Sequence, residues 1–162
     1  MPEFEFASDW RSGNLYLFEP NLPHLRGKPC RLPAIGSFDG RSAVWLLGNI
    51  ATDPQSRIDC VDDAVRPTLQ RNIALADKQS KITLHKGKSG DVLTGLPTAS
   101  FDFIYVDGSH RKIYVLEDSV LAFRLAKPGA IIGFDDYTLR EPARGDRALP
   151  SDLDTQALSC GA

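Results

Sequence analysis

Hydrophobic and polar residues follow a rhythm along this chain that predicts five strands separated by helices. Short apolar runs rich in β-branched and aromatic residues predict strands, and apolar residues three and four positions apart predict helices. The predicted strands span residues 30–35, 57–61, 81–85, 101–106 and 130–134. The predicted helices span residues 41–51, 64–76, 89–96 and 111–126, with a short one near 15–18. Because the strands alternate with helices, right-handed βαβ units and a parallel sheet are expected.

The helix predicted over residues 111–126 has an apolar face at helical spacing. That face carries Ile113, Leu116, Val120 and Phe123. Such a face normally packs on the core. The sequence Lys127-Pro128-Gly129 ends the helix, since proline and glycine interrupt helical backbone. The last two strands are almost wholly apolar, as expected for strands covered on both faces. The predicted fold is therefore α/β, with a Rossmann-like, doubly wound and mostly parallel sheet of about five strands.

Three segments divide the chain. Residues 1–29 form an irregular lead-in, residues 30–137 form the Rossmann-like domain, and residues 138–162 form a polar tail. The tail has no clear strand pattern, so we expect it to be loosely ordered. The last predicted strand would then be an apolar sheet edge. A homo-oligomer or a partner subunit could cover that edge.

Composition and charge narrow the function classes. The chain has 162 residues, of which 42% are hydrophobic and 25% are charged, which is typical of one globular domain. A net charge of -2 gives no reason to expect nucleic acid or an anionic membrane as partner. No apolar run is long enough to span a membrane. The first residues lack a signal-peptide pattern, and the three cysteines lack disulfide or zinc spacing. We expect a cytoplasmic protein that acts on a small molecule.

Candidate ligand groups follow four of the predicted strands. A glycine loop from Gly36 to Gly40 follows the first strand, and Asp62-Asp63 follows the second. Asp107 follows the fourth strand, and Asp135-Asp136 follows the fifth. Because ligands of open parallel sheets bind beyond the carboxyl ends of the strands, these groups predict a site at one edge.

The glycine loop suits a ligand that approaches the backbone closely. Gly36 and Gly40 permit a tight turn, and the following helix N-terminus offers N–H groups to an anion such as a carboxylate. Ser37 and Ser42 could bond a ligand or cap the helix. Phe38 could line a pocket or belong to the core.

The acidic residues could bind a ligand or serve only the local structure. Asp62 is placed to accept hydrogen bonds from ribose hydroxyls, while Asp63 could cap the next helix. If strands 101–106 and 130–134 are neighbours, Asp107, Asp135 and Asp136 converge, and an all-oxygen set suits Mg²⁺. The alternative is that these acids cap helices or are solvated. His110 could act as a general base or could only begin a helix.

Three segments carry a resemblance to a known family. "IGSFDGRSAVWLL", "FDFIYVDGSH" and "LAKPGAIIGFDDY" resemble class I S-adenosylmethionine-dependent methyltransferases. The most similar subgroup comprises small bacterial enzymes related to metal-dependent catechol O-methyltransferases. The resemblance implies that the methionine part of the cofactor is held by Gly36, Ser37, Phe38, Gly40 and Ser42. It also implies a ribose contact for Asp62, an adenine contact for Ser89, cofactor and metal contacts for Asp107, metal contacts for Asp135 and Asp136, and catalysis by His110.

The implied reaction is Mg²⁺-assisted O-methylation of a small hydroxylated substrate, such as a sugar or a catechol-like diol. Three positions depart from the family pattern: Ala34 replaces a usual acid, Pro33 stands in a central strand, and Lys88 replaces a frequent Asp. Only 25 residues follow Tyr137, and they do not show the helix and antiparallel strand pair that usually complete the family's sheet. Ala34, Pro33 and these missing strands keep open the alternative of a truncated or non-catalytic binding or interaction module. A nicotinamide-dependent oxidoreductase is disfavoured because the loop lacks the G-x-G-x-x-G spacing.

Overall fold

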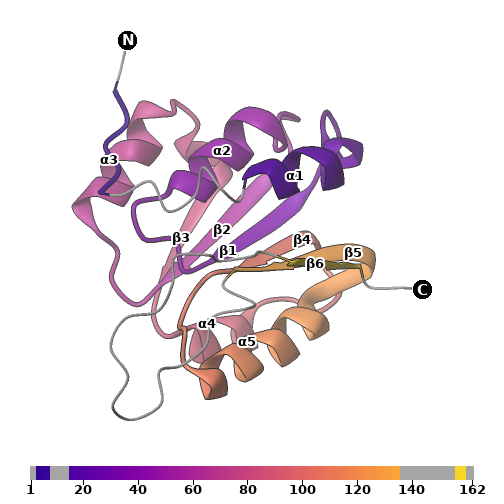
Figure 1. Ribbon diagram of the computed structural model, residues 1–162. Coiled ribbons are helices and arrows are strands. Elements are labelled where there is room, and N and C mark those ends of the chain that lie inside the picture. The colour runs from indigo at the N-terminus through magenta and orange to yellow at the C-terminus, as the bar shows by residue number, and fades with distance from the viewer. Residues whose placement is uncertain (1–2, 8–14, 136–155, 160–162) are drawn as a thin grey trace.

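The computed structural model describes residues 3–7, 15–135 and 156–159, whose backbone forms one six-stranded sheet with helices on both faces (Figure 1). The strands are β1 (Arg31–Ile35), β2 (Arg57–Asp62), β3 (Ile82–Lys86), β4 (Phe101–Val106), β5 (Ala126–Phe134) and β6 (Gln156–Ser159). The helices are α1 (Leu15–Asn21), α2 (Arg41–Asn49), α3 (Pro67–Leu75), α4 (Ser89–Gly95) and α5 (Lys112–Leu125), with 3-10 turns at Pro23–Leu25 and Gln79–Lys81. The strand order is β3-β2-β1-β4-β5-β6, and all pairs are parallel except β5 with β6. The predicted Rossmann-like fold is confirmed.

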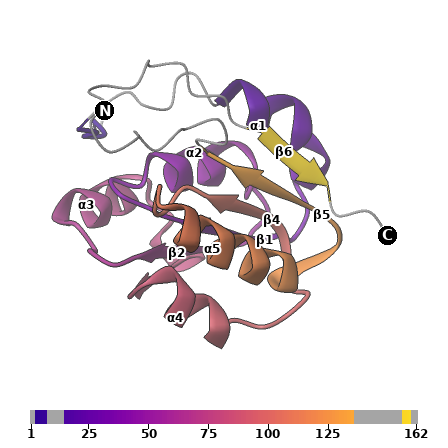
Figure 2. The same cartoon turned by 60° about the horizontal axis from the view of Figure 1, so that its bottom comes forward.

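Helices cover the sheet in two layers. α1, α2 and α3 lie on one face, and α4 and α5 lie side by side on the other (Figure 2). Each layer has its own hydrophobic cluster. The first contains Phe18, Leu46 and Tyr105, and the second contains Leu93 and Leu125. The described helices include none that is long and apolar enough to cross a membrane.

Pro33 is tolerated in the central strand β1 because of the side to which its nitrogen points. The carbonyl of Ile35 accepts the N–H of Asp107 on the β4 side, at 2.8 Å. Backbone groups alternate sides along a strand, so the nitrogen of Pro33 also faces β4. The β1–β4 pairing begins only at Ala34, and the N–H of Arg31 is taken by the Asp102 carboxylate instead. The missing donor therefore falls where these two strands are not yet paired.

The predicted core face of the helix over 111–126 is wrong. The four apolar residues of that face are all exposed, and the face that packs on the sheet contains Asp118, Ala122 and Leu125. The predicted end of this helix is correct, since α5 ends at Leu125, shortly before Lys127-Pro128-Gly129. A small residue at position 122 allows the helix to lie close to the sheet, which the periodicity of the sequence does not express.

The tail contributes a strand that the sequence pattern does not predict. β6 pairs antiparallel with β5, in a register that places Ile132 opposite Leu158. The expectation that β5 forms an open apolar edge is therefore wrong, because the chain's own β6 covers that edge. A β5 backbone with unpaired N–H and C=O groups can pair even with a short strand of modest propensity.

Candidate functional site

The loop between β1 and α2 is shaped by two glycines. Gly36 and Gly40 have φ angles of 83° and 80°, in the left-handed region. A Cβ atom on Gly36 would lie 1.9 Å from the carbonyl oxygen of Asp107. Gly36 is thus required for the close approach of β1 and β4. Gly40 is the N-cap of α2, and its N–H bonds the Ser37 carbonyl at 2.7 Å.

The two serines of the loop do not cap α2, since its N-cap is Gly40 and has no side-chain cap. The Ser37 hydroxyl donates to the carbonyl of Ala34, at 3.0 Å, and is buried. Ser42 is buried in the first turn of α2. Burial raises the pKa of the Cys60 thiol to about 12, an effect that the neighbouring Ser37 hydroxyl partly offsets. The Ser37 hydroxyl is therefore already used within the loop.

Phe38 does not belong to the core. Its side chain is 46% exposed, and its φ angle of 44° is unusual for a residue with a Cβ atom. The Arg66 guanidinium lies over the Phe38 ring, 4.2 Å from the centroid. Of the two readings of Phe38, only the surface or pocket-lining one agrees with this placement.

Asp62 ends β2 and holds the glycine loop from the neighbouring strand. One carboxylate oxygen accepts the N–H of Phe38 at 2.8 Å, and the other accepts the N–H of Ala64 at 2.9 Å. Each oxygen keeps a further lone pair, so hydroxyl donors could still bind. Asp63 does not cap α3, because the N-cap is Arg66, followed by Pro67 at the first helical position.

Asp107 and Asp135 lie at the ends of adjacent strands. Val106 and Phe134 are paired in the β4–β5 register, and the N–H of Asp135 bonds the Val106 carbonyl at 2.9 Å. The two aspartates are therefore neighbours at the edge that also carries the glycine loop. Asp136, the third predicted metal ligand, lies outside the described residues. Within residues 3–7, 15–135 and 156–159, no group of three or more acidic, histidine or cysteine side chains is placed to hold a metal ion.

His110 and Ser89 lie on loops at the same edge. His110 is exposed and precedes Arg111, the N-cap of α5. Ser89 is the first residue of α4, directly after the loop that leaves β3. Because β3 and β4 run parallel to β1, the loops that leave all three strands meet at one side of the sheet.

A buried polar cluster that the sequence analysis missed ties the N-terminal segment to the glycine loop. Asn72 of α3 accepts the N–H of Glu5 at 2.9 Å and donates to the carbonyls of Glu5 and Asp39, at 2.7 and 2.8 Å. The Asp39 carboxylate accepts the N–H of Ala7 at 3.0 Å and the hydroxyl of Thr68 at 2.7 Å. Asp39 and Asn72 are both buried. The only signal in the sequence is an amide beside Ile73 on the apolar face of that helix.

A second missed residue lies beneath the loop that carries His110. Asp118 of α5 is fully buried, and a Cβ atom on Gly108 would lie 3.4 Å from its carboxylate. Neither carboxylate oxygen has a hydrogen-bond partner in the described part of the chain. Burial raises the pKa of the Asp118 carboxyl, and the nearby Ser89 hydroxyl partly offsets this.

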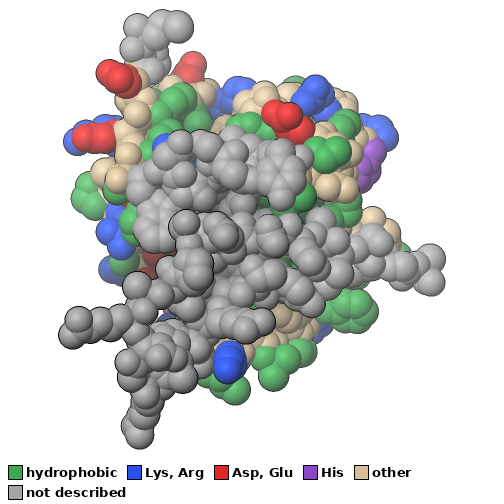
Figure 3. All heavy atoms as spheres, viewed as in Figure 1, with side chains coloured by type: hydrophobic (Ala, Val, Ile, Leu, Met, Phe, Trp, Pro, Cys, Tyr) green, Lys and Arg blue, Asp and Glu red, His purple; other side chains and the backbone are tan. Residues whose placement is uncertain are grey.

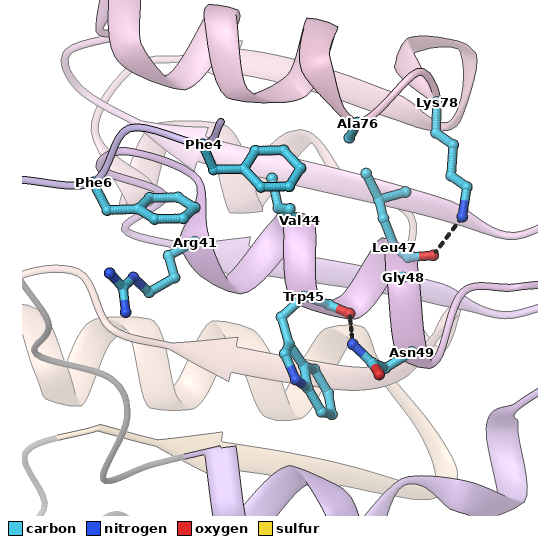
Figure 4. A pocket seen from close by; sticks show the side chains of 10 residues that line it. All are labelled: Phe4, Phe6, Arg41, Val44, Trp45, Leu47, Gly48, Asn49, Ala76 and Lys78. Atoms are coloured by element: carbon cyan, nitrogen blue, oxygen red, sulfur yellow. Dashed lines mark hydrogen bonds between the residues drawn. The ribbon is translucent and has the colours of Figure 1, made fainter. Parts of the chain in front are cut away.

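A pocket of about 440 Å³ lies on the side of α2 that faces away from the sheet (Figure 4). Phe4 and Phe6 border it along one side and Trp45 lies across from them. The Lys78 ammonium donates to the Leu47 carbonyl at 3.2 Å. None of the predicted site residues lines this pocket, so it is separate from the edge that carries Asp62 and Asp107.

One comparison with known proteins identifies a family. A family model described as a methyltransferase domain matches residues 34–137. No curated protein matches the chain.

Solved structures with the same fold include several O-methyltransferases. The Streptomyces achromogenes O-methyltransferase TomG, in complex with SAM, is 24% identical with a TM-score of 0.63, and the match covers 84% of this chain. The Bacillus cereus O-methyltransferase, in complex with SAH, is 20% identical with a TM-score of 0.60, and the match covers 83% of this chain. The MycE methyltransferase of mycinamycin biosynthesis, in complex with Mg and SAH, is 17% identical with a TM-score of 0.61, and the match covers 75% of this chain. This chain spans 59% of the length of each of the first two and 31% of the third. At these identities the likeness establishes the fold.

Proposed function

Because this chain belongs to the methyltransferase domain family, we propose that it transfers a methyl group from S-adenosylmethionine to an oxygen atom of a small hydroxylated substrate. The observation that carries the proposal is the meeting of a glycine loop, an acid after β2 and an acid pair after β4 and β5 at one sheet edge. Two solved structures with this fold are O-methyltransferases in complex with SAM or SAH, which supports oxygen as the methyl acceptor.

The methyl donor would lie along the glycine loop. The backbone from Gly36 to Gly40 and the N-terminus of α2 would bind its methionine part, with Phe38 and Ser42 beside it. Asp62 would accept the ribose hydroxyls with the lone pairs that Phe38 and Ala64 leave unused. Ser89 would lie near the adenine.

The acid pair would hold a divalent cation such as Mg²⁺. Carboxylate oxygens are the ligands that Mg²⁺ prefers, and Asp107 and Asp135 lie at neighbouring strand ends. Asp136 would be the third ligand. A bound cation of this kind would lower the pKa of a substrate hydroxyl, and two adjacent hydroxyls, as in a sugar or a catechol-like diol, would suit it best.

His110 would accept the proton of the substrate hydroxyl. An electron pair of the hydroxyl oxygen would form the bond to the methyl carbon, and the carbon–sulfur bond would break with its own electron pair left on sulfur, which becomes a thioether. The His110 ring takes up the proton. A general base of this kind contributes roughly 10²- to 10⁴-fold to the rate. The remaining acceleration would come from positioning the two substrates.

Calorimetric titration with S-adenosylmethionine, with and without Mg²⁺, tests binding. Transfer of a labelled methyl group to a panel of sugars and diols tests the reaction. His110→Ala should reduce transfer by about 100-fold or more and leave cofactor affinity unchanged. The matched control is His24→Ala, since His24 is also exposed and lies in the Pro23–Leu25 turn, next to Arg26, which bonds the carbonyl of Asn49 at the end of α2 that is remote from the glycine loop.

Each outcome has a distinct meaning. Binding without transfer to any acceptor would support the alternative of a binding module, which Ala34 in place of the family's acid favours. Displacement of S-adenosylmethionine by NAD would instead support an oxidoreductase. Transfer that is equally fast in the His110 and His24 variants would remove His110 from the mechanism.

A further inference from the structure

Helix α5 presents an apolar stripe to solvent. Its four members are exposed by between 61% and 69%, which is unusual for side chains of this size. They are Ile113, Leu116, Val120 and Phe123, hereafter the α5 stripe. Figure 3 shows hydrophobic side chains along the lower edge of the molecule, where α5 runs in Figure 1.

The stripe points directly away from the sheet. The buried face of α5 contains Asp118, Ala122 and Leu125, and at 100° per residue the stripe is centred on the opposite side of the helix. It is therefore not the residual edge of the core. Its members are three, four and three residues apart, which is the spacing of one seam in paired helices.

Two charged residues next to the stripe, Arg124 and Glu117, are turned toward α4. The Arg124 guanidinium donates to the carbonyls of Leu93 and Thr94, at 3.3 and 3.0 Å. The Glu117 carboxylate lies against Gly90, 2.7 Å from where a Cβ atom on that glycine would stand. These two charges are thus held to one side, and the stripe itself offers only apolar surface.

We propose that the α5 stripe is the two-fold interface of a homodimer in which the two α5 helices pack antiparallel. In that arrangement Ile113 lies opposite Phe123 of the partner subunit, and Leu116 lies opposite Val120 of the partner subunit. The two residue numbers of each pair add up to the same value, which is the condition for both pairs to face each other in one register of antiparallel helices. Each pair forms one layer of the interface. Each layer joins a larger side chain to a smaller one, which allows close packing.

The surface area favours a second copy over scattered exposure. Side chains of this size and exposure each present on the order of 100 Å², so the stripe amounts to roughly 400 Å² on each subunit, a contiguous patch that usually has a function. Two stripes together bury roughly 800 Å², and the bordering residues of α4 and α5 bring this near the roughly 1,000 Å² that a specific interface needs. The dimer is therefore expected to be weak, with a dissociation constant in the micromolar range.

Sedimentation velocity and light scattering on the full chain, from about 1 to 100 µM, test the dimer. The wild-type chain should shift from monomer to dimer over that range. Leu116→Glu and Val120→Glu should each stay monomeric throughout, with unchanged circular dichroism because both positions are exposed. The matched control is Gln70→Glu on α3, an exposed helical position on the opposite layer, which should dimerise like wild type.

Cross-linking tests the orientation. In a Cys160→Ser background, a mixture of Leu116→Cys and Val120→Cys chains should form a disulfide-linked dimer faster than either variant alone. Cys30 and Cys60 are buried and do not compete.

A wild-type chain that is monomeric at about 100 µM overturns the proposal, as does a dimer that Leu116→Glu leaves intact. Binding of monomeric wild type to anionic lipid vesicles, abolished by Leu116→Glu, would assign the stripe to a membrane surface instead and also overturn it. All of these results are independent of whether the chain binds S-adenosylmethionine.

Discussion

Replacing Gly36 with alanine is the sharpest test of how the site is built. Gly36 has a φ angle of 83°, and an alanine Cβ would stand 1.9 Å from the Asp107 carbonyl oxygen and 2.7 Å from the Gly108 Cα. Carbon and oxygen atoms in contact are normally about 3.3 Å apart. The substitution must therefore push β4 away from β1 or distort the loop, because the obstacle is backbone and cannot rotate aside.

The expected cost has two parts. A left-handed conformation costs alanine about 1 kcal/mol relative to glycine. The collision adds the loss of pairing at the end of β1, including the bond from the Asp107 N–H to the Ile35 carbonyl at 2.8 Å. We expect Gly36→Ala to lower the free energy of unfolding by about 3–4 kcal/mol in total.

Two other glycines allow the cost of the left-handed conformation to be measured apart from the cost of the collision. Gly129 has a φ angle of 81° and nothing within 4 Å of the added Cβ, so Gly129→Ala should cost about 1 kcal/mol. Gly40 has a φ angle of 80° and meets only the end of the Leu69 side chain, at 2.6 Å. Gly40→Ala should fall between the other two, because that side chain can shift.

Urea unfolding of the three variants, followed by tryptophan fluorescence, measures the series. The reasoning fails if Gly36→Ala is within about 0.5 kcal/mol of Gly129→Ala. It also fails if Gly40→Ala is the most damaging of the three. The same Gly36 variant should lose binding of S-adenosylmethionine, while Gly129→Ala should keep it.

Two further predictions concern the buried polar residues that the sequence analysis missed. Asn72→Ala should lower the free energy of unfolding by about 2–3 kcal/mol, because the buried Asp39 carbonyl loses its donor. Hydrogen exchange at the Glu5 amide should also accelerate, and a native exchange rate there would contradict this prediction. The control Gln70→Ala should change neither the stability nor the exchange rate. Asp118→Asn should raise the free energy of unfolding at pH 7 by about 1–2 kcal/mol, because it removes a buried carboxylate without a partner. Burial raises the pKa of Asp118 in the folded state, so the wild-type chain loses stability as the pH rises above the ordinary aspartate range. The stability gained by Asp118→Asn should therefore vanish near pH 4, which urea unfolding curves at pH 4 and pH 7 would measure. A gain that is equal at both pH values would refute that explanation.

The candidate site was largely predictable because it depends on order along the chain. Asp62, Asp107 and Asp135 each follow an apolar run, and parallel strands bring such positions to one edge whatever their exact register. The roles of individual atoms were not predictable. The Ser37 hydroxyl is used by Ala34, and the Asp62 oxygens already hold two backbone N–H groups, because side chains in a tight loop first satisfy their own backbone.

The partners of isolated polar residues also escaped prediction. The His85 ring lies 2.8 Å from the buried Asp59 carboxylate, which also accepts from Arg31 at 3.1 Å. These three residues lie on β3, β2 and β1. Neighbouring strands bring them together, and nothing in their spacing along the chain indicates it.

The sequence by itself determined the alternation of strands and helices, the α/β class, and the edge of the sheet at which the acids gather, because hydrophobic periodicity and chain direction are local properties. The tertiary structure alone decided which face of α5 is buried, that β6 pairs with β5, and that Pro33 can occupy a central strand. Those outcomes depend on the space, the unpaired backbone groups and the neighbouring strand that each segment meets once the chain has folded.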